Sequence, residues 1–256
     1  TAPTAANGRF SILGNFKGSF RRLGVGNIFM SSTTARELDV QEAAGSSTSG
    51  GFHLAYGAKA KLTGSTKFYN KVTLANTANL ALNGFALEVH NIYGTGLNAI
   101  TGSATSSLFI RGEVADNGSY IAMDDTVDGT SNYLQNLTIS NADENSSIFT
   151  FALLYGNLKV KNLALGPNGS VTNNNVLRTG TNGARGGSIT IDGTFFSWGN
   201  GIKVLSTASV TNSLTILDNV VIALPKSNVK VAEGSGTVNG IVNIGKNVKL
   251  NINEIV

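Results

Sequence analysis

The sequence predicts an all-β protein, a right-handed parallel β-helix or solenoid with an N-terminal cap or arm. Apolar residues two apart lie on one face of a strand, and such pairs recur at Leu80/Leu82, Leu108/Ile110, Leu137/Ile139, Leu158/Val160, Ile189/Ile191, Leu214/Ile216 and Val242/Ile244. Consecutive pairs begin 21 to 31 residues apart. A repeat of this length is typical of solenoids, so we expect about seven to nine stacked turns. The right hand follows from the usual chirality of parallel crossovers.

Residues that favour turns follow most of these pairs. Four positions after the first apolar residue come Gly84, Gly112, Asn141, Asn162, Gly193 and Asp218, residue types that tolerate turn or left-handed backbone. A second apolar strand then begins five or six residues after the first, as at Leu163 and Phe195. The same spacing fits two hairpin strands per repeat, so an antiparallel β-sandwich is the alternative fold.

The N-terminal part of the chain differs from the rest. We expect residues 1–45 to form an arm or cap and residues 46–256 to form the solenoid domain. Within the first part, Ala35–Ala44 has Leu38 and Val40 two apart, which favours a strand, and a short helix is the other interpretation. A cap here would cover the open apolar end of the first turn.

The solenoid part begins with a loop and contains long insertions. Gly45–Gly51 is rich in Gly and Ser, and strands resume at Phe52. The insertions are Asp116–Leu134, Ser140–Ile148, Pro167–Gly187 and Ala232–Asn239. The chain ends in an apolar strand containing Val248 and Leu250, which either seals the stack or offers a strand edge to a neighbouring molecule.

The composition suits tight turns and half-exposed strands. Only 13% of the residues are charged, against about 25% in a typical domain, while 31 are Gly. The chain has no cysteine, which excludes thiol catalysis, Cys-ligated zinc and disulfides. No apolar run approaches the length of a membrane helix, about 18 residues, so we expect no membrane insertion.

The net charge of +4 is spread along the chain. The densest basic cluster is Arg21-Arg22, next to Phe16 and Phe20, and we interpret it as a solvated turn beside core aromatics. A nucleic-acid site requires a concentrated basic stripe. We therefore expect no nucleic-acid partner.

One segment carries a resemblance to a known family. It contains Ser-Leu-Phe-Ile-Arg-Gly at Ser107–Gly112, a Met-Asp segment at Met123, a Gly-Thr-Ser-Asn turn from Gly129 and an Asn-Leu-Thr-Ile strand from Asn136. This segment resembles the β-helical repeats of large secreted surface proteins from Bacteroidota-type bacteria. The resemblance implies an extracellular, non-catalytic surface or adhesive role. This chain is shorter than the proteins of that family. It also looks somewhat like the β-helices of phage tailspikes and appendages.

A metal site is one candidate for function. Asp124-Asp125-Thr126-Val127-Asp128-Gly129 partly resembles a calcium loop, with oxygen ligands at alternate positions and a Gly for the turn. Asp124 and Asp128 are therefore the predicted metal ligands, for calcium. Gln135 lies near the place of the closing carboxylate and supplies none. No other cofactor is expected.

Aromatic residues near the C-terminal part offer a candidate sugar platform. Trp198 and Phe196 are the predicted carbohydrate-binding residues, because aromatic rings stack on sugars. Phe195 and Phe196 are adjacent on a strand, so one of the two must face the core.

Catalytic chemistry has weaker candidates in the sequence. Glu88 and His90 are two apart and share one face, where they would form a pair. A sugar-cleaving site would instead need carboxylates brought together from separate turns, such as Asp192 with Asp218. No catalytic residue is assigned, and the preferred interpretation is that the protein is not an enzyme.

These observations favour a non-enzymatic extracellular structural protein, a self-associating subunit of a surface layer, filament or appendage. It would form a homo-oligomer or polymer on a cell or virion surface, with Thr1–Gly8 adding as a strand to a neighbouring molecule. The alternative is a tailspike-like protein or adhesin that binds or cleaves cell-surface polysaccharide.

Overall fold

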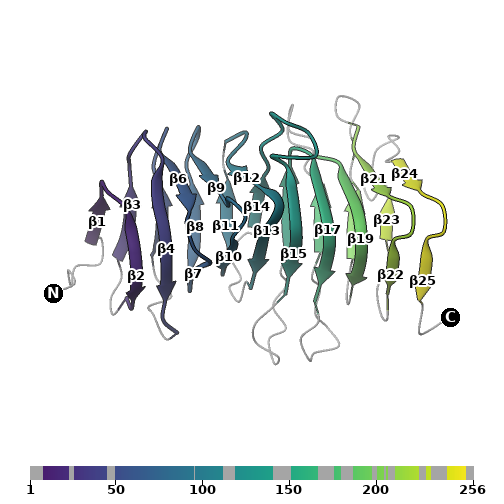
Figure 1. Ribbon diagram of the computed structural model, residues 1–256, viewed down its shortest axis with the longest axis horizontal. Coiled ribbons are helices and arrows are strands. Elements are labelled where there is room, and N and C mark those ends of the chain that lie inside the picture. Colours follow the sequence, from purple (N-terminus) through teal and green to yellow (C-terminus); the bar gives the residue numbers. More distant parts are fainter. Residues whose placement is uncertain are drawn as a thin grey trace.

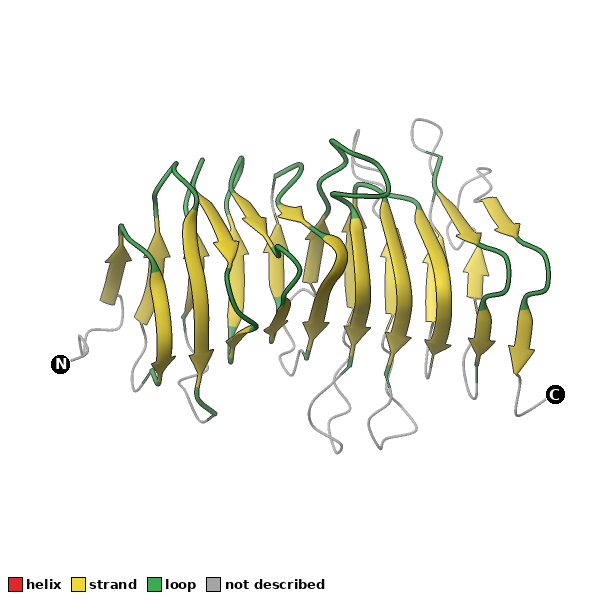
Figure 2. Cartoon of the chain, in the orientation of Figure 1, coloured by secondary structure: helices red, strands yellow, loops and turns green. Residues whose placement is uncertain are grey.

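Two parallel β-sheets make up the described part of the chain, as Figures 1 and 2 show. The structure is a computed structural model and describes residues 8–22, 26–44, 50–94, 96–111, 119–140, 151–166, 176–179, 187–197, 201–204, 206, 211–224, 229–231 and 241–251. These residues contain strands and turns and no helix. Every strand pair among them is parallel, which confirms the all-β parallel stack. The antiparallel sandwich is wrong, because it requires antiparallel neighbours.

The smaller sheet, sheet A, has ten strands that follow one another along the stack. They are β1 (Gly8–Ile12), β3 (Gly26–Met30), β5 (Gly51–Leu54), β8 (Lys71–Leu74), β11 (Ile92–Gly94), β14 (Ser119–Ala122), β16 (Phe151–Tyr155), β18 (Val176–Thr179), β20 (Gly201–Val204) and β23 (Val229–Val231).

The larger sheet, sheet B, has 15 strands because several turns contribute two short strands instead of one long one. They are β2 (Phe16–Phe20), β4 (Arg36–Glu42), β6 (Lys59–Leu62), β7 (Thr66–Phe68), β9 (Asn79–Ala81), β10 (Ala86–Val89), β12 (Ile100–Thr101), β13 (Ser103–Ile110), β15 (Tyr133–Ile139), β17 (Leu158–Leu165), β19 (Ile189–Ser197), β21 (Ser213–Ile216), β22 (Val221–Ala223), β24 (Ile241–Ile244) and β25 (Lys249–Asn251).

The chain alternates between the sheets, so each turn of the stack has one strand in sheet A and one or two in sheet B. Sheet A therefore counts ten turns, more than the repeat spacing predicted. The additional turns come from the N-terminal part: β1 to β4 extend both sheets with the same parallel pairing. The strand interpretation of Ala35–Ala44 is confirmed by β4. The domain boundary at residue 45 stays a prediction.

The pairing of strands differs from the one expected if each apolar pair of the sequence repeat lay opposite the next pair. Leu137 pairs with Leu163, and Leu158 pairs with Ile189, although Leu137 and Leu158 occupy equivalent positions in the repeated pattern. The difference arises because long strands of sheet B carry two apolar pairs each. The short interval of 21 residues between Leu137 and Leu158 thus joins two different columns of the stack.

Two predicted turn residues lie inside strands. Asn162 is within β17 and Gly193 within β19. The register between these strands shifts after Val160, which gives β19 one additional residue and makes a bulge near Gly193. A Cβ at Gly193 would lie 2.8 Å from the backbone oxygen of Lys161, so the residue that bulges is one that has no side chain.

Left-handed residues occupy the corners between sheet A and sheet B. Gly57, Thr77 and Asn98 have φ of 68°, 60° and 56° in three successive turns. Near the C-terminal end, Asn219 and Asn247 have φ of 64° and 57°, but each lies between two strands of sheet B, β21 and β22 in one case and β24 and β25 in the other. Gly and Asn reach this region at low energy, and they let the chain turn sharply at these positions.

The core lies between the sheets and consists of stacked apolar columns. Leu87, Leu108, Leu137, Leu163 and Phe195 form one column through five turns, and each is fully buried. Burying one such side chain contributes about 1.5–3 kcal/mol. The parallel stacking of like residues in register is therefore the main source of stability of the fold.

Polar side chains form a matching ladder on the outer face of sheet B. Thr194 Oγ1 donates to Asn162 Oδ1 (2.9 Å), Asn162 Nδ2 donates to Asn136 Oδ1 (3.0 Å), and Asn136 Nδ2 donates to Ser107 Oγ (2.9 Å). Each bond joins adjacent turns. The ladder fixes the register between β13 and β19 from the solvent side, as the leucine column does from the core.

One ion pair is buried near the start of the stack. Arg22 Nε lies 2.5 Å from Glu42 Oε1, and both side chains are almost inaccessible to solvent. The other Glu42 oxygen accepts a hydrogen bond from the Tyr69 backbone N–H at 2.8 Å. The interpretation of Arg21-Arg22 as a solvated turn is therefore wrong for Arg22, because an acidic partner from another turn lies beside it.

Candidate functional site

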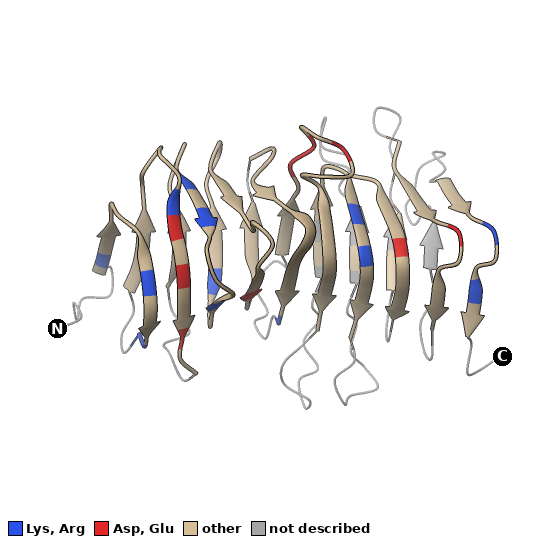
Figure 3. Cartoon of the chain, viewed as in Figure 1, with Lys and Arg blue, Asp and Glu red and all other residues tan. Residues whose placement is uncertain are grey.

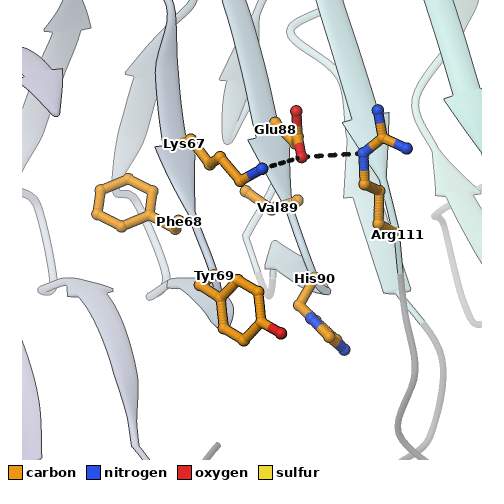
Figure 4. A pocket seen from close by; sticks show the side chains of 7 residues that line it. All are labelled: Lys67, Phe68, Tyr69, Glu88, Val89, His90 and Arg111. Atoms are coloured by element: carbon orange, nitrogen blue, oxygen red, sulfur yellow. Dashed lines mark ion pairs between the residues drawn. The ribbon is translucent and has the colours of Figure 1, made fainter. Parts of the chain in front are cut away.

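A pocket of about 140 Å³ lies on sheet B where three neighbouring strands end, and Figure 4 shows its walls. It is lined by Lys67, Phe68, Tyr69, Glu88, Val89, His90 and Arg111. Phe68 pairs in register with Val89, and Val89 pairs with Ile110. The residues that follow these three positions, Tyr69, His90 and Arg111, are consequently brought together from three successive turns.

The centre of the pocket wall is a carboxylate held by two cations. Glu88 Oε1 lies 2.8 Å from Lys67 Nζ and 2.9 Å from Arg111 Nε. The Tyr69 ring meets the His90 ring edge to face, with centroids 6.1 Å apart. The spacing of Glu88 and His90 indicated that both would share one face, and both do line the pocket. The sequence did not indicate Lys67, Tyr69 or Arg111, because they come from neighbouring turns.

The same charge arrangement occurs a second time without the aromatic wall. Glu37 on β4 lies 2.7 Å from Lys17 on β2 and 3.9 Å from Lys61 on β6. The hydrogen bond and charge of Lys17 lower the pKa of Glu37, with a smaller contribution from Lys61. Figure 3 shows basic and acidic positions close together on neighbouring strands in the first turns of the stack. Because a cation–carboxylate–cation triad joins three successive turns in both places, its first role is to join turns.

The predicted calcium ligands serve as hydrogen-bond acceptors within a turn. Asp124 accepts bonds from the Thr126 backbone N–H (3.0 Å), Thr126 Oγ1 (2.6 Å) and Thr101 Oγ1 (2.8 Å). Asp128 Oδ1 accepts one from Asn132 Nδ2 at 2.8 Å. In the part of the chain that the structure describes, no three His, Cys, Asp or Glu side chains gather as a metal site. Calcium binding stays a prediction.

A third aspartate lies beside the same turn. Burial raises the pKa of Asp125, against the effect of two hydrogen bonds from the Asn157 backbone N–H. These bonds tie the turn to the next one along the stack. The acidic cluster is thus part of the local turn structure.

The predicted sugar platform is only partly described. Phe196 faces outward on β19 and is half-buried between Ala164 and Ala223 of the adjacent turns, while Phe195 lies in the core. Trp198 lies outside the described residues. Carbohydrate binding at Phe196 and Trp198 stays a prediction.

The two aspartates suggested for catalysis have different partners. Asp192 Oδ2 lies 3.3 Å from Lys159 Nζ and accepts a hydrogen bond from Tyr133 Oη at 3.0 Å. Asp218 Oδ1 accepts one from the Lys246 backbone N–H at 2.7 Å. Each carboxylate therefore links neighbouring turns.

The last turn of the stack exposes its core-facing side chains. Ile244 pairs in register with Ile216, and Leu250 pairs with Ile222. Ile216 and Ile222 are 4% and 7% exposed, whereas Ile244 and Leu250 are 66% and 53% exposed. We call the surface formed by Val242, Ile244 and Leu250 the trailing end.

The first turn also exposes apolar side chains. Phe10 on β1 pairs with Ile28 in the core column, yet it is 57% exposed. Phe16 and Phe20 on β2 are partly buried, with ring centroids 5.2 Å apart. We call the surface formed by Phe10, Phe16 and Phe20 the leading end.

Comparison with protein-family models, curated proteins and solved structures finds nothing that matches this chain. Among the described residues, no helix has the length and apolar character needed to span a bilayer. The features of the molecule that bear on its function are therefore the pocket and the two ends of the stack.

Proposed function

We propose that this protein is a non-enzymatic structural subunit that self-associates through the ends of its β-stack. The observation that carries the proposal is the exposure of Ile244 and Leu250 at the trailing end, in columns that are otherwise buried. A self-associating subunit of a surface layer, filament or appendage needs exposed surfaces that a neighbouring copy can cover, and these ends are such surfaces. The low charge content and the resemblance to secreted β-helical surface proteins support a location at a cell or virion surface.

Two physical terms favour association at the ends. Covering exposed apolar area contributes about 25 cal/mol per Å². The edge strands also present unpaired backbone N–H and C=O groups, which another strand can satisfy. Each interior turn has apolar area buried and backbone groups paired by a neighbour on both sides. Each terminal turn has such a neighbour on one side.

Two finer expectations belong to this proposal. The stack winds in the right-handed sense, on the usual chirality of parallel crossovers. Residues 1–45 form the leading end as an arm or cap, and Thr1–Gly8 is the segment that adds as a strand to a neighbouring molecule; residues 1–7 lie outside the described part.

Polysaccharide binding is the second candidate, as in an adhesin or tailspike-like protein. The half-buried outward ring of Phe196 and the pocket at Glu88 favour it. A glycan-array screen with Phe196→Ala and Glu88→Gln tests it. Binding that both variants retain would exclude these two surfaces.

The test of self-association is the molar mass in solution over a range of concentrations, by light scattering, followed by negative-stain imaging. We expect the mass to grow with concentration and Ile244→Lys to reduce this growth, because it places a charge in the contact. Asn243→Lys is the matched control, since Asn243 is the exposed outward neighbour of Ile244. A monomer at every concentration would contradict the proposal.

A further inference from the structure

One outward-facing column crosses the whole stack and is exposed at both ends. Its members pair in register from each turn to the next: Ser19, Gln41, Lys67, Glu88, Phe109, Thr138, Ala164, Phe196, Ala223 and Asn251. Ser19 and Asn251 are both exposed. A further copy stacked by the same rule would set its Ser19 opposite Asn251.

The inward positions next to this column are apolar at the trailing end and carry no side chain at the leading end. At the trailing end this position is Leu250, whose side chain is exposed. At the leading end it is Gly18, which pairs with Val40 and around whose Cβ position no atom lies within 4 Å. Phe16 and Phe20 lie two residues to either side of Gly18, and their ring centroids are 5.2 Å apart. A parallel continuation of the stack would place Leu250 opposite Gly18, beside these two apolar rings.

The parallel pairing also sets the polarity of the contact. Because all described strand pairs are parallel, the rule that joins turns within the chain joins the last turn of one copy to the first turn of the next. Such a head-to-tail contact uses two different surfaces and does not close, so it grows into a filament. A twofold contact between two trailing ends would instead place Leu250 against Leu250 and antiparallel strands against each other.

The charges at this contact make it sensitive to salt. Lys249 and Lys17 are two residues before Asn251 and Ser19, so in that register they would face each other across the contact. Like charges opposite each other on neighbouring strands are destabilising. Glu37 lies 2.7 Å from Lys17 and partly offsets this repulsion. Added salt screens what remains.

We infer that copies of this protein join head to tail by parallel strand addition, with Asn251 of one copy opposite Ser19 of the next. The inference rests on the proposed self-association and specifies its partner, polarity and register. It also implies that assembly increases with ionic strength, whereas assembly through ion pairs would decrease.

The chain has no cysteine, so single-cysteine variants test the register directly. Adjacent strands are about 4.8 Å apart, within the Cα–Cα range of a disulfide, whereas a two-residue offset raises the distance to about 8 Å, beyond that range. Ser19→Cys is mixed with Asn251→Cys under mild oxidation, and Ser19→Cys with Lys249→Cys is the offset control. We expect a mixed disulfide dimer in the first mixture, its loss in the control, and a higher yield at high salt.

Each other outcome identifies what fails. Disulfide dimers of Asn251→Cys with itself, and none with Ser19→Cys, would overturn the head-to-tail polarity. Filaments of the unmodified protein without the mixed disulfide would overturn the register while self-association stands. Light scattering that finds only monomer for the unmodified protein would contradict the proposed function itself, and with it this inference.

Discussion

The last two turns of sheet B have the same pattern and opposite environments. Ser213–Ile216 and Ile241–Ile244 are four-residue strands that pair in register, with core-facing residues at the same positions. Ile216 is 4% exposed and Ile244 is 66% exposed. The difference shows that the alternation of residues selects the face of the strand, while the presence of a next turn decides whether that face is buried.

The largest expected effect is the difference between Ile216→Ala and Ile244→Ala in the free energy of unfolding. We expect Ile216→Ala to lower the free energy of unfolding by about 2–5 kcal/mol, because it leaves a cavity in a packed column. Ile244→Ala should change it by no more than about 0.5 kcal/mol in dilute protein, as at other exposed positions. Urea unfolding of both variants measures the difference. Equal losses at low concentration would show that the trailing end is covered within one molecule.

A smaller effect is expected for the polar ladder. Asn162 bonds to turns on both sides, so Asn162→Ala should lower the free energy of unfolding by about 1–2 kcal/mol. Asn243 makes one exposed bond, to Thr215 Oγ1 at 3.3 Å, and its replacement by Ala should cost less than about 0.5 kcal/mol. Denaturant midpoints measured in parallel compare the two. If Asn243→Ala lowers the free energy of unfolding as much as Asn162→Ala, the contribution of a ladder residue does not depend on whether its turn is interior or terminal.

The smallest expected effect is a pH dependence at an interior turn. Burial lowers the pKa of His53 below 6.5, with further contributions from the charges of Lys71, Arg22 and Arg9. The unfolded chain therefore takes up a proton at higher pH than the folded protein. The stability that neutral His53 contributes is fully present above pH 6.5 and is lost as the pH falls through the folded-state pKa.

We expect His53→Gln to reduce the loss of stability between pH 7.5 and pH 5. Gln keeps a side chain that can bond to Asn27, whose Oδ1 lies 3.0 Å from His53 Nε2, and removes the titrating ring. Unfolding midpoints at the two pH values provide the measurement. An unchanged pH slope in the variant would show that other groups set the dependence.

Much of the fold was accessible from local patterns. Apolar pairs two apart, as at Leu108/Ile110 and Leu214/Ile216, correctly predicted strands and a stacked parallel arrangement. The site was much less accessible. Glu88 and His90 share a strand end and could be paired from their spacing, whereas Lys67 and Arg111 reach Glu88 only because the turns before and after it stack in that register.

By itself the sequence determined which residues form strands and which face of each strand is apolar, because these properties depend on a few neighbouring residues. The tertiary structure decided which turns pair, and therefore the asparagine ladder, the buried Arg22–Glu42 pair and the pocket. Repeats of unequal length allow several registers with similar local patterns. The choice among them depends on contacts between residues about one full turn apart, such as Leu137 with Leu163.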